Sequence, residues 1–237
     1  MIGKTAAMLD SAVFDGHLRT MNTPSRRSVL LGFGTLAATG FAATGPAFAQ
    51  NAAQQANPQV AEVERYFNGI RTMQARFVQS NPNGTPAHGT LSVRRPGRMR
   101  FEYDPPSQLK IVADGSQVTM WDIPNRDFGQ WPIGWTAASF LVREPLVLHG
   151  GDLAVEKVER ADGMLQLTMS QAKKPQEGKV IVRLSENPMV LRGWSIIDNR
   201  NQRVDVSLNG LQTGLQLADS LFKYDGPDAG MIRRGAN

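Results

Sequence analysis

The chain has 237 residues, of which 41% are hydrophobic and 20% are charged, the composition of a globular protein. It contains no cysteine, which excludes disulfide bonds, cysteine-ligated zinc, thiol catalysis and a lipidated N-terminal cysteine. Its 23 glycines and 14 prolines indicate many turns and favour a β-rich fold over a helical bundle.

The first part of the chain has the features of an export signal. Arg26 and Arg27 form a twin-arginine pair, an apolar run follows over residues 29–43, and residues 47–49 match the A-x-A cleavage pattern. The run is shorter than the roughly 20 residues that cross a bilayer, which favours a cleaved signal over an anchor. We expect cleavage after Ala49 and export by the twin-arginine (Tat) route or the Sec route. An amphipathic or buried N-terminal helix is the alternative.

Removal of residues 1–49 leaves a weakly basic chain. That segment holds four of the 26 basic and two of the 21 acidic residues, so the net charge falls from +5 to +3. An excess this small does not indicate nucleic acid binding, and we expect no nucleic acid partner. Translation starts at Met1 or at Met21. Residues 50–57, rich in Ala, Gln and Asn, are predicted to form a flexible tether.

An amphipathic helix is predicted from Pro58 onward. Val60, Val63, Phe67 and Ile70 follow at spacings of three and four residues, which places them on one apolar stripe with charged residues between them. The stripe is expected to pack against the rest of the domain.

From Met73 onward the apolar period changes to two, the pattern of half-buried strands. The predicted strands cover residues 73–79, 90–94, 98–104, 110–113, 117–123, 128–133, 165–169, 180–184, 194–196 and 204–208. A short helix over 135–142, capped by Thr136, interrupts them. Ten or eleven antiparallel strands predict one highly curved sheet in a single domain over residues 58–228. The basic residues 229–237 are expected to be a disordered tail.

Candidate catalytic residues are few. After the signal only His88 and His149 remain, each next to a glycine, and a histidine in a loop is the simplest interpretation of both. Residues 149–151, His-Gly-Gly, are similar to an oxyanion-hole loop, but no G-x-S-x-G nucleophile elbow accompanies them. No metal-ligand motif, phosphate-binding glycine loop or acidic cluster is present. The sequence predicts a protein that is not an enzyme and needs no metal and no cofactor.

The apolar residues on one face of the predicted sheet have two interpretations. They fill a packed core, or they form a surface that binds apolar ligands. Seven of the ten methionines follow the predicted cleavage site, and flexible thioethers suit a surface that accepts varied apolar ligands. Both interpretations stay open on this pattern alone.

Five segments, taken in order, resemble the periplasmic outer-membrane lipoprotein carrier family (LolA-like). The predicted helix runs into M-Q-A-R-F-V-Q at 73–79, and G-x-L-x-V-x-R-P at 89–96 precedes an aromatic strand. An Asp-Gly hairpin at 114–115 leads to Trp121-Asp122, and a short S-F-L-V segment occupies 139–142. The last segment, A-D-S-L-F-K-Y-D-G-P, is similar to the family's closing strand and lies at 218–227.

The resemblance implies a fold, a function and partners. The fold is mainly β with α: an unclosed antiparallel β-barrel of about 11 strands, with helices as a lid over its concave apolar face. The protein would be a periplasmic carrier that binds the acyl chains of lipoproteins and transfers them from the inner to the outer membrane. Its partners would be acylated lipoproteins, an inner-membrane lipoprotein-releasing ABC transporter, and an outer-membrane receptor or the outer membrane. We expect a monomer without catalysis.

The arginine before proline is the family's signature position, which is associated with holding the lid closed. Arg95 is therefore the expected latch, and its expected partner is the segment Phe140, Leu141 and Val142. Strand parity agrees that Arg95 points inward, because it shares a face with Leu91 and with Val93. An inward arginine that only fixes the end of a strand is the alternative.

The neighbouring arginines Arg94, Arg98 and Arg100 fall on the opposite parity and are expected to face solvent. The expected acyl-chain cavity comprises Val63, Phe67, Ile70, Phe77, Leu91, Val93, Met99, Phe101, Tyr103, Met120, Leu165, Leu167, Met169 and Val182.

Two other functions compete with the carrier. A related periplasmic barrel would bind or sense another lipid, and a secreted hydrolase is a weaker alternative. A lipoprotein-accepting receptor is disfavoured, because it would need the lipidated cysteine that the chain lacks.

Overall fold

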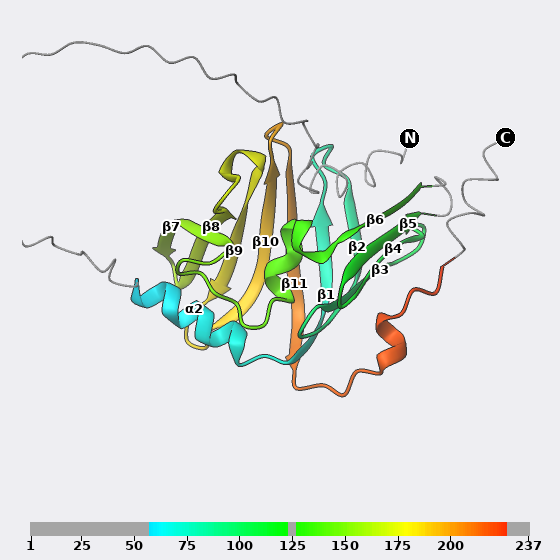
Figure 1. Cartoon of the computed structure of the whole chain (residues 1–237), viewed down its shortest axis with the longest axis horizontal. Coiled ribbons are helices and arrows are strands. Elements are labelled where there is room, and N and C mark those ends of the chain that lie inside the picture. The colour runs from blue at the N-terminus through cyan, green and yellow to red at the C-terminus, as the bar shows by residue number, and fades with distance from the viewer. Residues whose placement is uncertain (1–56, 123–126, 227–237) are drawn as a thin grey trace, which may run out of the picture. The chain divides into compact units, whose positions relative to one another are not determined.

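The computed structural model describes residues 57–122 and 127–226 (Figure 1). The predicted export signal, nearly all of the tether and the basic tail lie outside the described residues. No helix among the described residues is long and apolar enough to cross a membrane.

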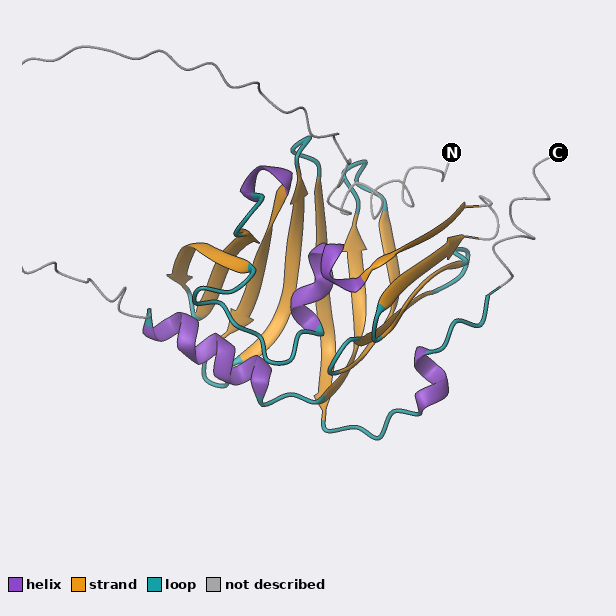
Figure 2. Ribbon diagram, in the orientation of Figure 1, coloured by secondary structure: helices purple, strands orange, loops and turns teal. Residues whose placement is uncertain are grey.

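Eleven strands form one antiparallel sheet (Figure 2). Their order is β6-β5-β4-β3-β2-β1-β11-β10-β9-β8-β7, so β6 and β7 are the edges and the sheet is not closed into a barrel. This confirms the predicted fold class. The bounds are β1 Thr72–Ser80, β2 Pro86–Arg94, β3 Arg98–Tyr103, β4 Leu109–Asp114, β5 Gln117–Asp122, β6 Asp127–Pro132, β7 Leu153–Ala161, β8 Met164–Gln171, β9 Gly178–Ser185, β10 Val190–Asp198 and β11 Arg203–Thr213.

Alternation along the central strands builds the concave side of the sheet. On β1, Met73, Ala75 and Phe77 are buried, as the period of two predicts. The Phe77 ring packs edge-on against Tyr103 with centroids 5.0 Å apart. Gly89, its neighbour on β2, leaves room for that ring, because a Cβ there would lie 2.6 Å from it.

Helix α2 (Pro58–Asn68) packs its apolar stripe against the sheet and buries Val60, Val63 and Phe67. The side chain of Asn57 accepts a hydrogen bond from the Gln59 N–H at 3.0 Å, which caps the first turn. This confirms the predicted helix, which ends before Gly69.

The segment between β6 and β7 runs from one edge of the sheet to the other. It holds two 3-10 helices, η1 (Ile133–Trp135) and η2 (Ala137–Leu141), in place of the single helix expected over 135–142. Every residue of η2 is buried, and η2 lies over the middle of the concave face in Figure 2. Thr136 does not cap η2; its hydroxyl donates back to the Ile133 carbonyl at 3.1 Å.

Strand β7 is the strand that the periodicity missed. It is an edge strand with a largely exposed run of charged residues, Glu156, Lys157, Glu159 and Arg160. Charges on an edge discourage pairing with other chains, and they also remove the apolar alternation that would identify the strand.

The expectation for residues 218–227 was wrong, because the described part of this segment forms no strand. It contains the 3-10 helix η4 (Asp219–Phe222), which packs on the outer face of β3 and β4. Two arginines expected in solvent lie beneath it. Arg100 is 5% exposed and donates to Asp225 at 3.0 Å. Arg94 is half-buried, with its guanidinium 5.0 Å from the centroid of the Phe222 ring.

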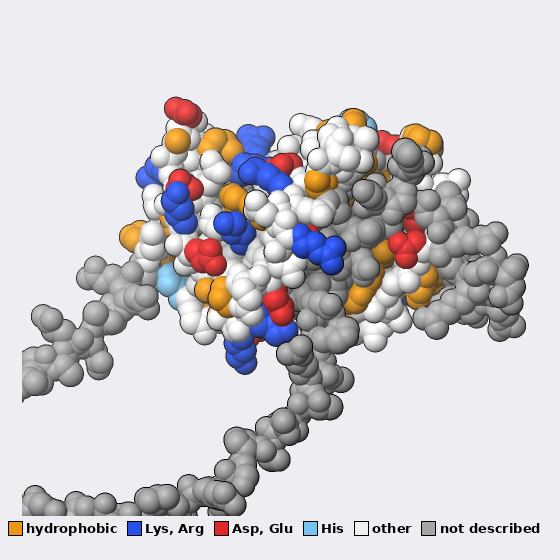
Figure 3. Space-filling model, turned by 90° about the horizontal axis from the view of Figure 1, so that it is seen from above, with side chains coloured by type: hydrophobic (Ala, Val, Ile, Leu, Met, Phe, Trp, Pro, Cys, Tyr) orange, Lys and Arg blue, Asp and Glu red, His pale blue; other side chains and the backbone are white. Residues whose placement is uncertain are grey.

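Arg98 alone of the three arginines is exposed, as predicted. Strand alternation therefore correctly placed all three arginines on the outer face of the sheet. The C-terminal segment covers two of them, Arg94 and Arg100. Figure 3 shows basic and acidic side chains interspersed, rather than gathered by sign, on the face that it views.

We expect the C-terminal segment to loosen from the sheet in acid. Burial raises the pKa of Asp225, but the hydrogen bond and charge of Arg100 outweigh this and leave it below its ordinary value. A hydrogen bond from Arg94 lowers the pKa of Asp219. A carboxyl whose folded pKa is lowered stabilises the fold above its unfolded pKa of about 4, and this stability is lost as the pH falls through the folded value.

The measurement is the midpoint of thermal unfolding between pH 7 and pH 3, compared with that of Asp225→Asn. The variant should be less stable at neutral pH and should converge with the wild type at the acid end. A constant difference across this range would contradict the assignment.

Candidate functional site

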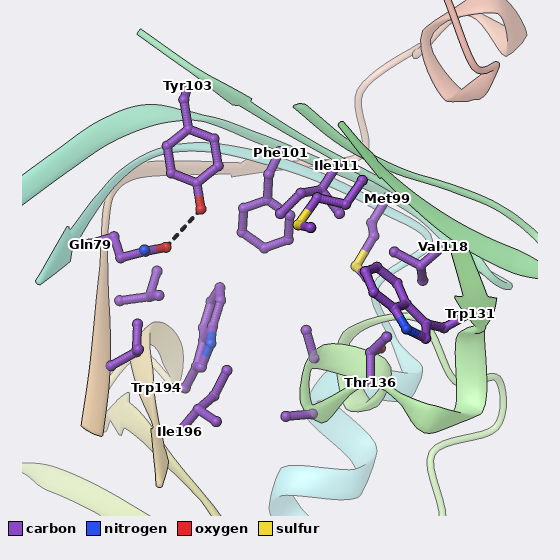
Figure 4. A pocket seen from close by; sticks show the side chains of 15 residues that line it. Gln79, Met99, Phe101, Tyr103, Ile111, Val118, Trp131, Thr136, Trp194 and Ile196 are labelled. Carbon is purple, nitrogen blue, oxygen red and sulfur yellow. Dashed lines mark hydrogen bonds between the residues drawn. The ribbon is translucent and has the colours of Figure 1, made fainter. Parts of the chain in front are cut away.

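A pocket opens on the concave side of the sheet (Figure 4). Its empty space, which includes the open solvent at its mouth, is about 760 Å³. Most of the wall is apolar, and no charged side chain of the described residues lines it. Its lining residues are Gln79, Met99, Phe101, Tyr103, Ile111, Val118, Met120, Trp131, Thr136, Ala137, Ala138, Trp194, Ile196, Val204 and Val206.

Four of the expected cavity residues line this main pocket: Met99, Phe101, Tyr103 and Met120. Met169 lines a smaller pocket instead. The others lie in or against the packed core: Val63, Phe67, Ile70, Phe77, Leu91, Val93, Leu165, Leu167 and Val182. All of these residues except Ile70 are buried in one core cluster, and the main pocket opens beside only part of it.

The lining residues that the sequence reasoning missed come mainly from β4, β5, β6, β10 and β11. Strand parity identifies several as inward-facing, Trp194 and Ile196 among them. Parity cannot tell a pocket wall from a core contact, because that depends on what lies opposite. Here the opposite element is η2, which contributes Ala137 and Ala138.

The smaller pocket, of about 320 Å³, lies beside the other face of η2 and is lined partly by β7, β8 and β9. Thr136 and Ala137 border both pockets, so η2 separates them. Phe140 of η2 packs edge-on against Phe67 and against Trp194, each at 5.9 Å between ring centroids. These contacts place η2 between α2 and β10.

Arg95 joins the sheet to the segments that cover it. It is 5% exposed. Its guanidinium donates to the Phe67 carbonyl, to the Arg143 carbonyl, and to the Ile70 carbonyl at 3.4 Å. It also donates to the Asn68 side chain at 3.2 Å. Burial lowers the pKa of Arg95, and the charge of Glu144 offsets part of that effect.

These acceptors differ in part from the expected ones. Backbone carbonyls do receive the guanidinium, but they belong to the end of α2, to Ile70 and to Arg143, one residue beyond the segment Phe140–Val142. Within that segment, the Val142 carbonyl accepts from the Gly97 N–H at 2.9 Å.

Comparison with known proteins decides the family. The family model described as "Outer membrane lipoprotein carrier protein LolA" matches residues 68–225, which is more than half of the chain. The chain belongs to the LolA family.

Named relatives agree with this membership. An outer-membrane lipoprotein carrier protein of Legionella pneumophila (strain Lens) is 28% identical over 173 residues, covering 68% of this chain and 82% of the relative. One of Pseudomonas entomophila (strain L48) is 27% identical over 180 residues, covering 71% of this chain and 84% of the relative. Among solved structures, a LolA superfamily protein of Nitrosomonas europaea is similar, with 10% identity, a TM-score of 0.39, and coverage of 70% of this chain and 97% of that one.

In this LolA-family chain, α2 and the loop before β7 are held together as one cover. Asn68 exchanges two hydrogen bonds with the backbone of Leu146, at 3.0 and 2.8 Å. Glu64 accepts from the Leu148 N–H and lies 3.2 Å from His149. We call α2 together with residues 133–149 the cover.

The two histidines lie on different elements. His149 is in the loop of the cover, as expected, whereas His88 lies on β2 rather than in a loop. Among the described ranges, 57–122 and 127–226, no three His, Asp or Glu side chains gather to hold a metal ion.

Proposed function

We propose that this LolA-family chain binds the acyl chains of lipoproteins in the main pocket and carries them through the periplasm. The observation that supports this is the pocket itself, which opens on the concave side, is mostly apolar, and has no charged side chain in its wall among the residues that the structure describes. Each CH₂ of an acyl chain moved from water into such a site gains about 0.8 kcal/mol, so several buried CH₂ groups suffice for stable binding.

The cover supplies the means of loading and release. Because η2 separates the two pockets, a shift of η2 would join them into one longer space. Arg95 stabilises the closed cover by binding α2 and the Arg143 carbonyl at once. Binding of cargo then competes with closure of the cover. The free-energy difference between the closed state and the cargo-bound state sets how readily the acyl chain is released.

The partners follow from this role. Cargo would come from an inner-membrane lipoprotein-releasing ABC transporter and leave to an outer-membrane receptor or the outer membrane. The chain would act as a monomer after export, with residues 1–49 removed as its signal. Carriage needs neither a metal nor a cofactor.

The test is native purification. The full chain, expressed with its own signal and isolated from periplasm, should co-purify with acylated lipoprotein or acyl lipid that mass spectrometry detects. A protein that carries neither contradicts the proposal. Bound lipid without lipoprotein would favour the lipid-binding barrel. Turnover of an ester panel that is lost in His149→Ala would favour the hydrolase.

A further inference from the structure

The main pocket is not uniform, since a buried pair of hydrogen-bonded polar side chains, Tyr103 and Gln79, lies on one side of it. The Tyr103 hydroxyl donates to the Gln79 side-chain oxygen at 2.7 Å, and the Gln79 amide donates to Asn81 at 2.7 Å. Figure 4 shows Tyr103, Gln79 and Trp194 on one side of the pocket, and Met99, Val118 and Trp131 on the other. A ligand with one polar end therefore has a preferred direction.

Trp194 carries a hydrogen-bond donor without a partner. The residue is 1% exposed and lines the pocket, and its Nε1 has no acceptor among the described residues. A buried N–H that lacks an acceptor is costly, and an acceptor on a ligand would remove that cost. Gln79 adds a second donor, because only one of its two amide hydrogens is used by Asn81.

Within residues 57–122 and 127–226, the pocket has donors for a ligand but no cation. None of its lining residues is Lys, Arg or His. An ionised carboxylate placed here would be buried without a counter-charge, which is strongly unfavourable. A neutral carbonyl oxygen accepts the same hydrogen bonds without that cost.

We propose that the main pocket binds acyl groups by their neutral carbonyl, with Trp194 Nε1 as its donor, and discriminates against free fatty acids. This inference rests on the proposed carrier function and narrows its ligand to ester- or amide-linked chains. The hydrocarbon tail then lies toward Met99 and Val118, and the carbonyl lies beside Trp194 and Gln79. Burial keeps the Tyr103 hydroxyl protonated by raising its pKa, so that group stays a neutral donor.

The test compares two ligands that differ only in the carbonyl. Displacement of a fluorescent acyl probe gives the affinities of monododecanoylglycerol and of dodecyl glyceryl ether for the full mature chain. A neutral hydrogen bond predicts that the wild type binds the ester about 3- to 10-fold more tightly than the ether. In Trp194→Phe this ratio should fall, and only the part that the Gln79 amide supplies should remain.

Trp131→Phe is the matched control, because it makes the same change on the opposite side of the pocket. It should keep the ester-to-ether ratio of the wild type, and any general loss of affinity cancels in that ratio. A wild type without preference for the ester, or an undiminished preference in Trp194→Phe, would overturn the inference.

A third ligand tests the charge argument on the wild type alone, without relying on the folding of a variant. Dodecanoic acid should bind weakly at pH 7 and more tightly as its carboxyl is neutralised near pH 4 to 5. Equal binding of the acid and the ester at pH 7 would overturn the inference while leaving the carrier function intact. Failure of the wild type to bind any of the three ligands would count against the carrier function itself.

Discussion

Arg95→Leu should bind acyl cargo more tightly and release it more slowly than the wild type. In the variant the Arg143 carbonyl loses its donor and the Phe67 carbonyl keeps only the Ile70 N–H. Both carbonyls regain the lost hydrogen bonds when the cover lifts toward water. Loss of a charged hydrogen bond costs about 1.5–3 kcal/mol of closed-state stability, so apparent affinity should rise about 10- to 100-fold.

Two measurements check this expectation. Transfer of a fluorescent acylated lipopeptide from the carrier to acceptor vesicles should slow, and amide hydrogen exchange over residues 58–70 and 143–148 should quicken. Arg98→Leu is the matched control, since that arginine is exposed on the outer face and should change neither. Transfer and exchange at wild-type rates in Arg95→Leu would leave Arg95 as a residue that only fixes the end of a strand.

Ala138→Trp should block acyl binding while leaving the fold intact. Ala138 lines the main pocket, so the larger side chain can extend into space that is already there. If it displaces three to four CH₂ groups of a bound chain, affinity should fall by about 100-fold. Binding is measured by probe displacement and stability by thermal unfolding.

Ala113→Trp provides the contrast. Ala113 is 0% exposed on β4 and does not line the pocket, so the same substitution there overpacks the core. That change should destabilise the fold by at least about 1–3 kcal/mol. If both variants unfold alike, or both bind cargo, the space beside Ala138 is not the binding site.

Strand alternation predicted much of this fold, because one face of each central strand is buried against the cover. Leu91 and Arg95 were placed inward correctly, since parity depends only on the strand's own register. Strand β7 was missed because its charged edge position removes that signal. Neither 3-10 helix of the cover has a periodicity long enough to recognise.

The site was harder to predict than the fold, for a reason that Leu167 and Met120 illustrate. Both are inward, apolar and buried, yet only Met120 faces the main pocket. What separates them is the position of η2, which a strand pattern cannot encode. Arg100 shows the same limit on the outer face, where a segment more than 100 residues away in the chain covers it.

The link from β6 to β7 has a mechanical consequence. Its two ends are fixed to the two free edges of the sheet, and η2 lies between them. Residues 133–152 could reach roughly 70 Å if fully extended. Because the segment is folded into the concave side, it can lengthen when its two ends move apart. If the two edges move apart to admit a bulky acyl chain, this linking segment must extend, and η2 must move away from the sheet. We therefore expect the width of the sheet and the depth of the binding space to change together, as one covalently coupled motion.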